Sequence, residues 1–337
     1  MPKVSVIMSV YNERRYLIDS IQSILNQTFQ DFEFIIIDDY SEDVDPSVRA
    51  VINSFTTDAR IKLIRNGANI GLTKSLNKGL FASSGEYIAR QDADDVSERV
   101  RLQHQVRYLD NHPEIGVLGT STTIINEIGD EIDEWEAAPN PMESLKVRNG
   151  LTHGSVMFRR TVMEDVGKYD ENFRYAQDYE YWLRISKKYQ IRNLPSRLYQ
   201  SRVHYEMISF ARTEAQARYV ILAQRKATLG LDAMSGQWSR EEKIRFHTIL
   251  AYSFTQMNLM NEVNHQMEAI FQLDPLNIEN LIRKIAYILN GRAGIIYTQN
   301  TYRKLRKEFQ SRKQFVQNFL NRQKKGTSES KGLESSG

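Results

Sequence analysis

The stretch RQDADD at residues 90–95 is the part of the sequence around which the rest is organised. It follows an apolar run over 87–89, which is typical of a buried strand, and it precedes a helical pattern over 99–109. Three carboxylates therefore fall where a strand ends and a loop begins, and placing them there costs stability unless a cation or hydrogen-bond donors compensate. Asp92 and Asp94 are two residues apart, so an extended backbone directs both side chains to the same side.

Oxygen ligands on one side of a chain suit Mg²⁺ or Mn²⁺, and these metals often share their coordination shell with a diphosphate. The alternative is an acidic turn in which Asp94 or Asp95 caps the helix that follows. Because Asp-x-Asp is common in loops, the stretch alone leaves both interpretations open, and its surroundings have to decide between them.

Strands and helices alternate on the amino-terminal side of this stretch. The apolar periodicity predicts strands over 4–10, 32–37, 61–64 and 86–91, and helices over 15–26, 46–55 and 72–82. Such alternation favours a mostly parallel sheet with helices on both faces, since each crossover between parallel strands needs a connecting element.

Polar side chains collect where these strands end. They are Tyr11, Asn12 and Glu13 after the first strand, Asp38 and Asp39 after the second, and Asp92 and Asp94 after the fourth. In open α/β sheets ligands bind outside the carboxyl ends of the strands, so the sequence predicts a site at this edge. The sequence has no G-x-G-x-x-G and no G-x-x-x-x-G-K-[ST] motif, so dinucleotide and P-loop chemistry lack their usual signals.

Downstream, the pattern predicts strands over 115–122, 155–158 and 197–200 and a helix over 175–185, while residues 123–150 show weak periodicity. A tight polar turn over 152–155 contains His153, and a lone histidine of this kind is more often structural than functional. Asp178 falls near the start of its helix, where the macrodipole favours a carboxylate, so a capping role is the simple interpretation.

Taken together, the pieces resemble the inverting glycosyltransferases of family 2, which have the GT-A nucleotide-sugar fold. The resemblance covers residues 3 to about 209. It rests on SVIMSVYN at 5–12, IDDYS at 37–41, NIG at 69–71 with Asn77 and Gly79, GEYIAR at 85–90 before the acidic loop, and QDYEYW at 177–182. Each piece is weak alone, but their joint order and spacing are specific.

The resemblance implies a role for each matching position. Asp94 would hold the divalent metal, Mn²⁺ or Mg²⁺, on the donor diphosphate, Asp92 would contact the ribose or the metal shell, and Asp178 would be the catalytic base. The remaining positions are Ser9, Tyr11, Glu13, Asp38, Asp39 and Lys74 around the donor nucleotide, His153, Gly154 and Gln177 near the donor sugar and acceptor, and His204 in the metal shell. Two positions depart from the family pattern: Gln177 stands where the family has glutamate, and Tyr40 stands where it commonly has glycine.

The implied activity is transfer of a sugar, UDP-linked by the habit of the family, to an acceptor hydroxyl with inversion, in polysaccharide, glycan or glycolipid biosynthesis. Two alternatives stay open: a catalytically inactive nucleotide-sugar-binding or scaffold protein, and a nucleotidyltransferase. The presence of Asp92, Asp94 and Asp178 argues against the first. The second gives Asp178 no obvious task.

The strand-rich pattern stops after residue 209, and helices are predicted over 214–229, 240–257, 262–273 and 278–289. We therefore expect a catalytic domain over 1–210, a helical region over 211–325 and a disordered tail over 326–337. A basic amphipathic segment over 302–325 suits either an anionic membrane surface or a helix packed on the protein by its aromatic side.

Composition excludes several classes of protein. A net charge of +3 over 337 residues is too small to indicate nucleic-acid binding. Without cysteine the chain has no disulfide, thiol nucleophile or thiolate metal site, which fits the cytoplasm. No apolar run approaches the ~20 residues that span a bilayer, and the first residues lack a signal-peptide layout. We expect a cytoplasmic protein, or one peripheral at the cytoplasmic face of the membrane, with a saccharide or lipid-linked acceptor.

Overall fold

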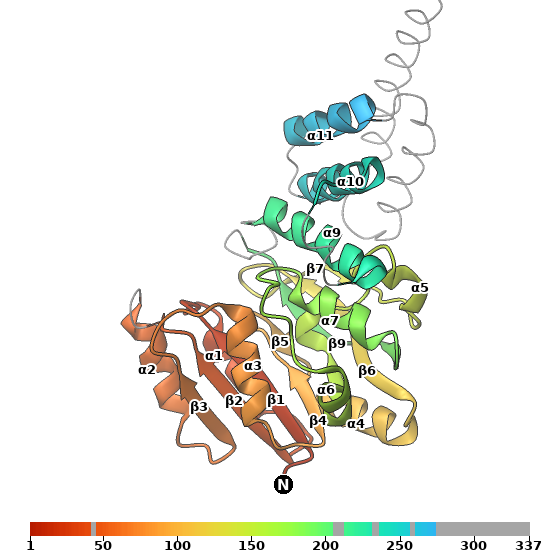
Figure 1. The fold of residues 1–337 in the computed structure, drawn as a ribbon. Coiled ribbons are helices and arrows are strands. Elements are labelled where there is room, and N and C mark those ends of the chain that lie inside the picture. Colours follow the sequence, from red (N-terminus) through yellow and green to blue (C-terminus); the bar gives the residue numbers. More distant parts are fainter. Residues whose placement is uncertain (42–44, 205–211, 231–235, 257–259, 274–337) are drawn as a thin grey trace, which may run out of the picture. The chain divides into compact units, whose positions relative to one another are not determined.

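The computed structural model describes residues 1–41, 45–204, 212–230, 236–256 and 260–273 (Figure 1). Residues Met1–Leu273 form one compact unit. The helix predicted over 278–289, the basic segment 302–325 and the tail 326–337 lie outside the described residues. The division into domains at residue 210 stays a prediction.

One nine-stranded sheet runs through the described residues, with the strand order β3-β2-β1-β4-β8-β6-β9-β5 and with β7 paired to β6. The strands are β1 Val4–Val10, β2 Phe32–Asp38, β3 Ile61–Arg65, β4 Tyr87–Arg90, β5 Val96–Ser97, β6 Ile115–Ile125, β7 Glu131–Trp135, β8 Met157–Arg159 and β9 Gln190–Arg202. The helices are α1 Leu17–Leu25, α2 Pro46–Phe55, α3 Leu72–Ala82, α4 Arg101–Asn111, α5 Met142–Leu145, α6 Arg160–Val166, α7 Gln177–Ile185, α9 Thr213–Leu229, α10 Arg240–Gln256 and α11 Met260–Leu273.

Strands β3, β2, β1 and β4 are parallel neighbours, as the alternating pattern predicted. Their registers bring Val10 opposite Asp38 and Ile7 opposite Arg90, so the carboxyl ends of the three strands β1, β2 and β4 share one edge. The predicted α/β class, with a parallel portion of the sheet and helices on both faces, is confirmed.

The second half of the sheet is mixed, which the expectation of alternation throughout did not foresee. Strand β8 lies antiparallel between β4 and β6, and β5 and β7 are antiparallel edge additions. Strand β9 is much longer than the predicted 197–200. Its first half was missed because it contains Pro195 and polar residues, and its pairing with β6 shifts register at Thr120 and Ser121. Residues Glu131–Trp135 had no predicted strand because acidic residues dominate them.

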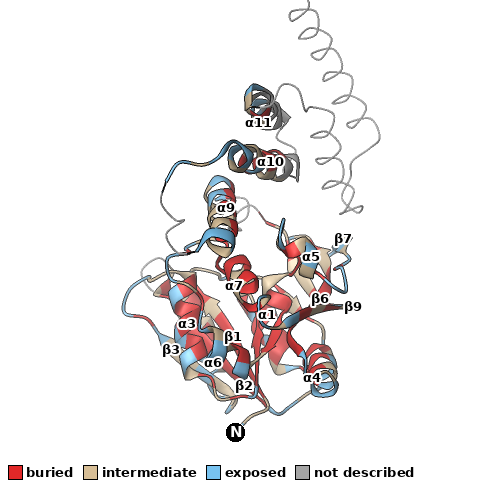
Figure 2. Cartoon of the chain, turned by 45° about the vertical axis from the view of Figure 1, so that its right-hand side comes forward, coloured by how far each residue is buried: buried red, intermediate tan, exposed pale blue. Residues whose placement is uncertain are grey.

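Two apolar layers cover the two faces of the sheet, and β1 supplies both because alternate residues of a strand point to opposite faces. Ile7 packs with residues of α3, α6 and α7, whereas Val6 and Met8 pack with residues of α1, α2 and α4. Figure 2 shows buried residues concentrated in the central strands and in α7. Strands buried on both faces account for the continuous apolar runs in the sequence.

Helix α9 packs against α7, and Ala223 of α9 belongs to the same apolar cluster as Tyr179 and Trp182. Helices α10 and α11 pack together beyond it. In the part of the chain that is described, no helix combines the length and the apolar character needed to cross a membrane.

Candidate functional site

The acidic loop over 91–95 is wound around a fully buried glutamine. The Gln91 amide donates to the Asp95 carbonyl oxygen at 2.9 Å and to the hydroxyl of Ser20 at 3.0 Å, and its oxygen accepts from Ser97 at 2.6 Å. These bonds fix the loop at the end of β4 without the carboxylates of Asp92 and Asp94, although the Asp92 carbonyl oxygen also accepts from Gln91 and Ser20. The sequence reasoning assigned no role to Gln91.

The capping interpretation of the loop is wrong. Helix α4 has Val100 at its N-cap, and no side chain accepts a hydrogen bond there. Asp95 is buried instead and accepts the backbone N–H of Arg202 at 2.8 Å, which ties the loop to β9. Burial raises the pKa of Asp95 well above its ordinary value, and the charges of Asp94 and Asp92 raise it further.

Asp92 is held by a buried arginine. The Arg90 guanidinium donates to Asp92 Oδ1 at 2.6 Å, and the Asp92 backbone N–H donates to the Tyr199 hydroxyl at 3.2 Å. Burial raises the pKa of Asp92, while the charge of Arg90 lowers it and that of Asp94 raises it. The orientation of this carboxylate is therefore set by its neighbours on β4 and β9.

Gly154 lies against Asp92 and admits no side chain. A Cβ built at Gly154 would be 1.9 Å from the Tyr199 hydroxyl oxygen and 2.7 Å from Asp92 Oδ2. The Gly154 carbonyl oxygen accepts from buried Arg101 at 2.7 Å. The predicted glycine turn is therefore in contact with the predicted Asp-x-Asp aspartate.

Asp94 meets His204 at the outer side of the loop. Asp94 Oδ2 and His204 Nε2 are 3.0 Å apart, and the guanidinium of Arg202 donates to the Asp94 carbonyl oxygen at 3.0 Å. Glu13 belongs to the same group, because its pKa is raised by burial and by the charge of Asp94 and is lowered by His204. The structure thus brings Asp94 and His204, from the ends of β4 and β9, into contact, and the charges of both act on Glu13 after β1.

A carboxylate and an imidazole fit a divalent cation that takes its other ligands from phosphate and water. No cluster of three or more metal-binding side chains occurs among the residues that the structure describes. A cation held by Asp94 and His204 alone would therefore depend on the diphosphate for much of its shell.

Asp178 faces the loop from α7. It lies in the first turn, behind Ala176 at the N-cap, which has a left-handed φ of 51° and no side-chain cap bond. Its Oδ2 accepts from the Asn149 side chain at 2.6 Å. Burial raises the pKa of Asp178, the hydrogen bond from Asn149 lowers it, and the charge of Asp92 raises it. Asp178 is therefore part of the same electrostatic group as Asp92.

His153 is partly buried and Gln177 is buried, and the role of both near the donor sugar stays a prediction. His153 Nε2 is 2.9 Å from the Tyr169 hydroxyl and 3.4 Å from Arg90 Nε. Burial and then the Arg90 charge lower the pKa of His153 well below its ordinary value, so the ring is neutral. Gln177 is buried at the start of α7.

The paired aspartates after β2 shape the backbone near the predicted nucleotide position. Asp39 accepts from the backbone N–H groups of Ile70 at 2.9 Å and Gly71 at 2.8 Å, and Asp38 accepts from that of Ser41 at 2.9 Å. Tyr40, which directly follows the two aspartates, has φ 70°, a conformation that favours glycine. Tyr40 thus takes a left-handed conformation at the position where the family pattern commonly has glycine.

Three other residues that were predicted to lie around the nucleotide are partly buried or exposed. Ser9 is partly buried at the end of β1, and Tyr11 beyond it is 47% exposed. Lys74 is exposed on α3. Lys78, one turn further along α3, donates to the Asn66 side chain at 2.7 Å. No sequence signal distinguished the two lysines.

Residues 5–167 match the model of a protein family described as Glycosyl transferase family 2. The chain is 34% identical over 215 residues to an uncharacterized glycosyltransferase of Haemophilus influenzae, covering 60% of this chain and 66% of that one. It is 36% identical over 206 residues to EpsE of Bacillus subtilis, covering 60% and 73%. It is 35% identical over 187 residues to the O-antigen biosynthesis glycosyltransferase WbnJ of Escherichia coli, covering 54% and 71%. The match to the Haemophilus protein thus spans just under two thirds of its length.

Solved structures share the fold. Staphylococcus aureus TarS 1-349, in a crystal structure with UDP-GlcNAc, superposes with a TM-score of 0.57 at 17% identity, covering 92% of both chains. The mannosyltransferase PcManGT of Pyrobaculum calidifontis, in complex with GDP-Man and Mn²⁺, superposes with a TM-score of 0.54 at 20% identity, covering 85% of this chain and 80% of that one. At these identities the likeness concerns the fold.

Proposed function

The chain belongs to glycosyl transferase family 2, and on that premise we propose that it transfers a sugar from a nucleoside-diphosphate sugar to an acceptor hydroxyl with inversion at the anomeric carbon. The observation that carries the proposal is the grouping of carboxylates at the carboxyl edge of the parallel strands: Asp92 lies against Gly154, Asp94 lies against His204 in the same loop, and the charge of Asp92 acts on Asp178. A scaffold protein would have no need for neighbouring carboxylates at this edge, where the charge of Asp94 raises the pKa of Asp92 and the charge of Asp92 raises that of Asp178.

The reaction forms a bond between the acceptor oxygen and the anomeric carbon, and it breaks the bond from that carbon to the diphosphate. Asp94 and His204 would hold a divalent cation, Mn²⁺ or Mg²⁺, which when bound neutralises charge on the diphosphate. Asp92, oriented by Arg90, contacts the donor ribose or the metal shell.

Asp178 accepts the proton of the acceptor hydroxyl, and general-base help of this kind is typically worth about 10²–10⁴-fold in rate. Its position in the first turn of α7, where the charge of Asp92 acts on it, supports a base close to the donor site. Inversion requires this base to act on the face of the sugar opposite the diphosphate. Burial raises the pKa of Asp178 and makes the carboxylate a better proton acceptor, while the bond from Asn149 keeps the charged form available.

We infer a UDP-linked donor, and the fold shared with TarS bound to UDP-GlcNAc supports this choice. GDP-linked donors are the nearest competitor, since PcManGT carries GDP-Man. The name of WbnJ supports a saccharide or lipid-linked saccharide acceptor in polysaccharide synthesis. Peripheral contact with the cytoplasmic face of a membrane stays a prediction, because the basic segment 302–325 lies outside the described residues.

The test is thermal unfolding of the wild type with Mn²⁺ and a panel of UDP, GDP, dTDP and their sugars. A ligand at about 100 times its dissociation constant adds roughly 2.7 kcal/mol to the free energy of unfolding. We expect one nucleotide to raise the midpoint, with a requirement for metal, and we expect Asp94→Ala to lose the shift. Asp31→Ala, an exposed aspartate at the far edge of the sheet, is the control and keeps the shift.

Failure has a clear form. If no nucleotide shifts the midpoint and no labelled donor releases its nucleoside diphosphate, the transferase proposal falls. A metal-independent shift that Asp94→Ala retains would keep the nucleotide site and remove Asp94 from the metal role.

A further inference from the structure

Gln224 of α9 joins the two segments that meet at the proposed base. Its side-chain Nε2 donates to the Val147 carbonyl oxygen at 3.0 Å and to the Tyr179 hydroxyl at 3.0 Å. Tyr179 directly follows Asp178 in α7, and Val147 lies two residues before Asn149. One amide group therefore joins the Val147 backbone to the Tyr179 side chain, and so links the two segments that carry Asn149 and Asp178.

The contacts around Gln224 are closed to solvent and continue into α10. Gln224 is 7% exposed and Tyr179 is 1% exposed. The Tyr179 hydroxyl donates in turn to the Leu145 carbonyl oxygen at 2.6 Å, and Arg245 of α10 donates to Gln224 Oε1 at 2.7 Å. Burial raises the pKa of Tyr179 to about 12, so the phenol keeps its proton and its donor role.

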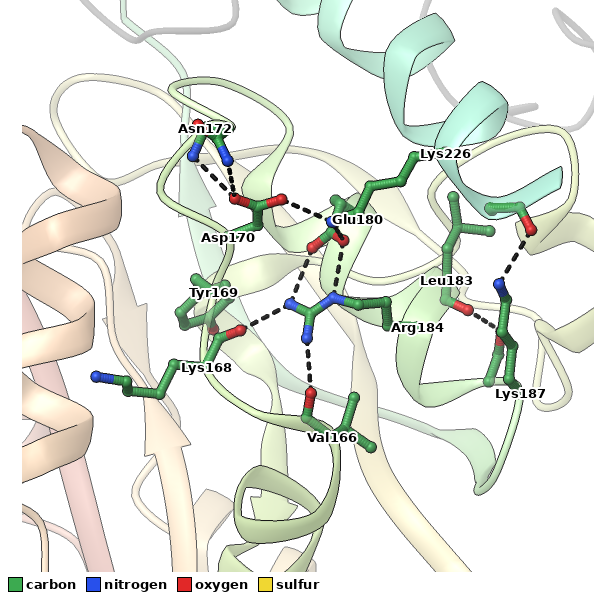
Figure 3. Close-up of polar contacts among 12 residues, drawn as sticks. Val166, Lys168, Tyr169, Asp170, Asn172, Glu180, Leu183, Arg184, Lys187 and Lys226 are labelled. Atoms are coloured by element: carbon green, nitrogen blue, oxygen red, sulfur yellow. Dashed lines mark hydrogen bonds and ion pairs between the residues drawn. The ribbon is translucent and has the colours of Figure 1, made fainter. Parts of the chain in front are cut away.

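A second set of contacts from α9 holds α7 in place (Figure 3). Lys226 lies 2.6 Å from Glu180 Oε1 and 2.6 Å from Asp170 Oδ2. Arg184, one turn along α7, donates to both oxygens of Glu180 at 2.8 and 2.9 Å and also to the Val166 and Lys168 carbonyl oxygens. Glu180 is 1% exposed, so these cations compensate a buried charge one half-turn from Asp178.

The segment that carries Asn149 depends on these tertiary contacts. It follows the single-turn helix α5, and Val147 within it is exposed. The Asn149 side chain donates to Asp178 at 2.6 Å and accepts from the Leu151 backbone N–H at 3.2 Å, which fixes the direction of its amide. A shift of the segment would weaken the bond to Asp178 first, because that bond crosses between two elements.

We propose that Gln224 is a positioning residue for the transfer reaction: by fastening the Asn149 segment to α7, it orients Asp178 toward the acceptor. The inference rests on the base role proposed above for Asp178. It makes α9 a working part of the catalytic unit, with Lys226 and Arg245 holding α9 and Gln224 in register.

Loss of the Gln224 hydrogen bonds to Val147 and Tyr179 is expected to change the pH dependence of kcat. The groups that act on Asp178 are the Tyr179 backbone N–H and the Asn149 side chain, whose hydrogen bonds lower its pKa, Asp92, whose charge raises it, and the buried phenol of Tyr169. When the Asn149 bond weakens, the pKa of Asp178 rises. The carboxylate is then protonated over a wider range, so the acidic limb of kcat shifts to higher pH.

The test is a double-mutant cycle with Gln224→Ala and Asn149→Ala. The probe is nucleoside diphosphate release from UDP-GlcNAc, UDP-glucose, UDP-galactose and GDP-mannose, with water as the acceptor. We expect each single variant to lower kcat by about tenfold with donor KM unchanged and with the acidic limb moved upward. The double variant falls no further than Asn149→Ala, because both act through one hydrogen bond. If the loss of kcat in the double variant equals the product of the two single losses, the inference is overturned.

Lys187→Met is the matched control, since Lys187 also joins the end of α7 to α9, through the Ala227 carbonyl oxygen at 3.0 Å. It should leave kcat unchanged. Hydrogen exchange gives a readout that needs no turnover: exchange over 145–149 rises in Gln224→Ala and not in Lys187→Met. Equal exchange in the wild type and Gln224→Ala would overturn the inference.

The proposed function fails in a different way. Nucleotide release that survives Asp178→Asn would remove the base role itself. Release that is lost in Asp178→Asn but unchanged in Gln224→Ala would overturn only the role of α9.

Discussion

Single residues decide how closely the carboxylates of the site approach one another. Arg101 is fully buried and donates to the Gly154 carbonyl oxygen at 2.7 Å and to that of Arg90 at 2.9 Å. Its guanidinium lies 5.4 Å from the centre of the Tyr199 ring, and burial lowers the pKa of Arg101 to about 10, so it remains a cation at neutral pH. The charge of buried Arg101 therefore offsets that of Asp92 and lowers the pKa of Asp92.

Gly154→Ala tests this close packing. The added methyl group meets the Tyr199 hydroxyl and Asp92, so either β9 or the acidic loop must shift. Overpacking of this kind typically costs about 1–3 kcal/mol. We expect a lower unfolding midpoint and at least a tenfold weaker nucleotide affinity, measured by thermal unfolding and calorimetric titration.

Gly67→Ala is the control, because its added Cβ meets nothing within 4 Å. Equal nucleotide affinity in the two variants would show that Gly154 is not in contact with the donor site.

At the scale of elements, the sequence predicted what depends on local pattern. The bounds of α2 and α3 agree with the apolar periodicity, and β1 agrees over its whole length. Strand ends with polar residues were correctly expected to share one edge, because parallel pairing requires it. A strand was predicted over 155–158, where β8 lies, but its antiparallel pairing was not foreseen, and neither was the first half of β9, since their partners are distant in the chain.

The same distinction holds for the site. Asp94 and His204 were assigned to one metal shell by resemblance, and the structure brings them into contact. The contact of Asp92 with Gly154, which was assigned to the donor sugar, was not predicted. Gln91, Arg101 and Asn149 gave no signal, because their roles depend on backbone carbonyls and side chains that only the fold brings near. Polar residues with structural tasks look like any surface residue in a single sequence.

Glu33 joins β1, β2 and β3 to the segment after α3, and its ionisation predicts how the stability of the fold depends on pH. Glu33 of β2 accepts from Ser5 of β1 at 2.6 Å and from the Ser84 backbone N–H at 2.6 Å, and it pairs with Lys62 of β3. Burial raises the pKa of Glu33, but the bonds from Lys62, Ser5 and Ser84 outweigh it and lower the pKa to about 2.

Because the folded pKa is below the unfolded one, this stability is present above about pH 4.5 and is lost as the pH falls toward 2. The loss is at most about 3 kcal/mol. Urea unfolding from pH 6 to pH 2.5 should show a steeper decline in the wild type than in Glu33→Gln. Exposed Glu114→Gln should follow the wild type; parallel curves for all three proteins would contradict the assignment.

At the scale of the whole molecule, the question is how far the catalytic unit extends. The sequence predicts a boundary at residue 210, where the strand pattern stops. The packing extends further, because Ala223 of α9 lies in the central apolar cluster and Tyr219, Val220 and Leu222 pack against it. Lys226 and Gln224 add polar bonds to α7 across the same contact.

A comparison of chains ending at residues 210 and 273 decides where the unit ends. Removing α9 exposes apolar surface on α7 and leaves Glu180 with Arg184 as its remaining cation partner among the described contacts. Each apolar side chain that loses its cover costs about 1.5–3 kcal/mol, so two of them lower the midpoint by roughly 10 °C. We expect the chain ending at 273 to unfold at the wild-type midpoint and to bind nucleotide. The chain ending at 210 should unfold at a lower temperature and bind an apolar dye, and its Asn149–Asp178 hydrogen bond should weaken. Equal midpoints for the two chains would support the boundary at 210 and reduce α9 to an appendage, and they would also weaken the case that Gln224 positions the base.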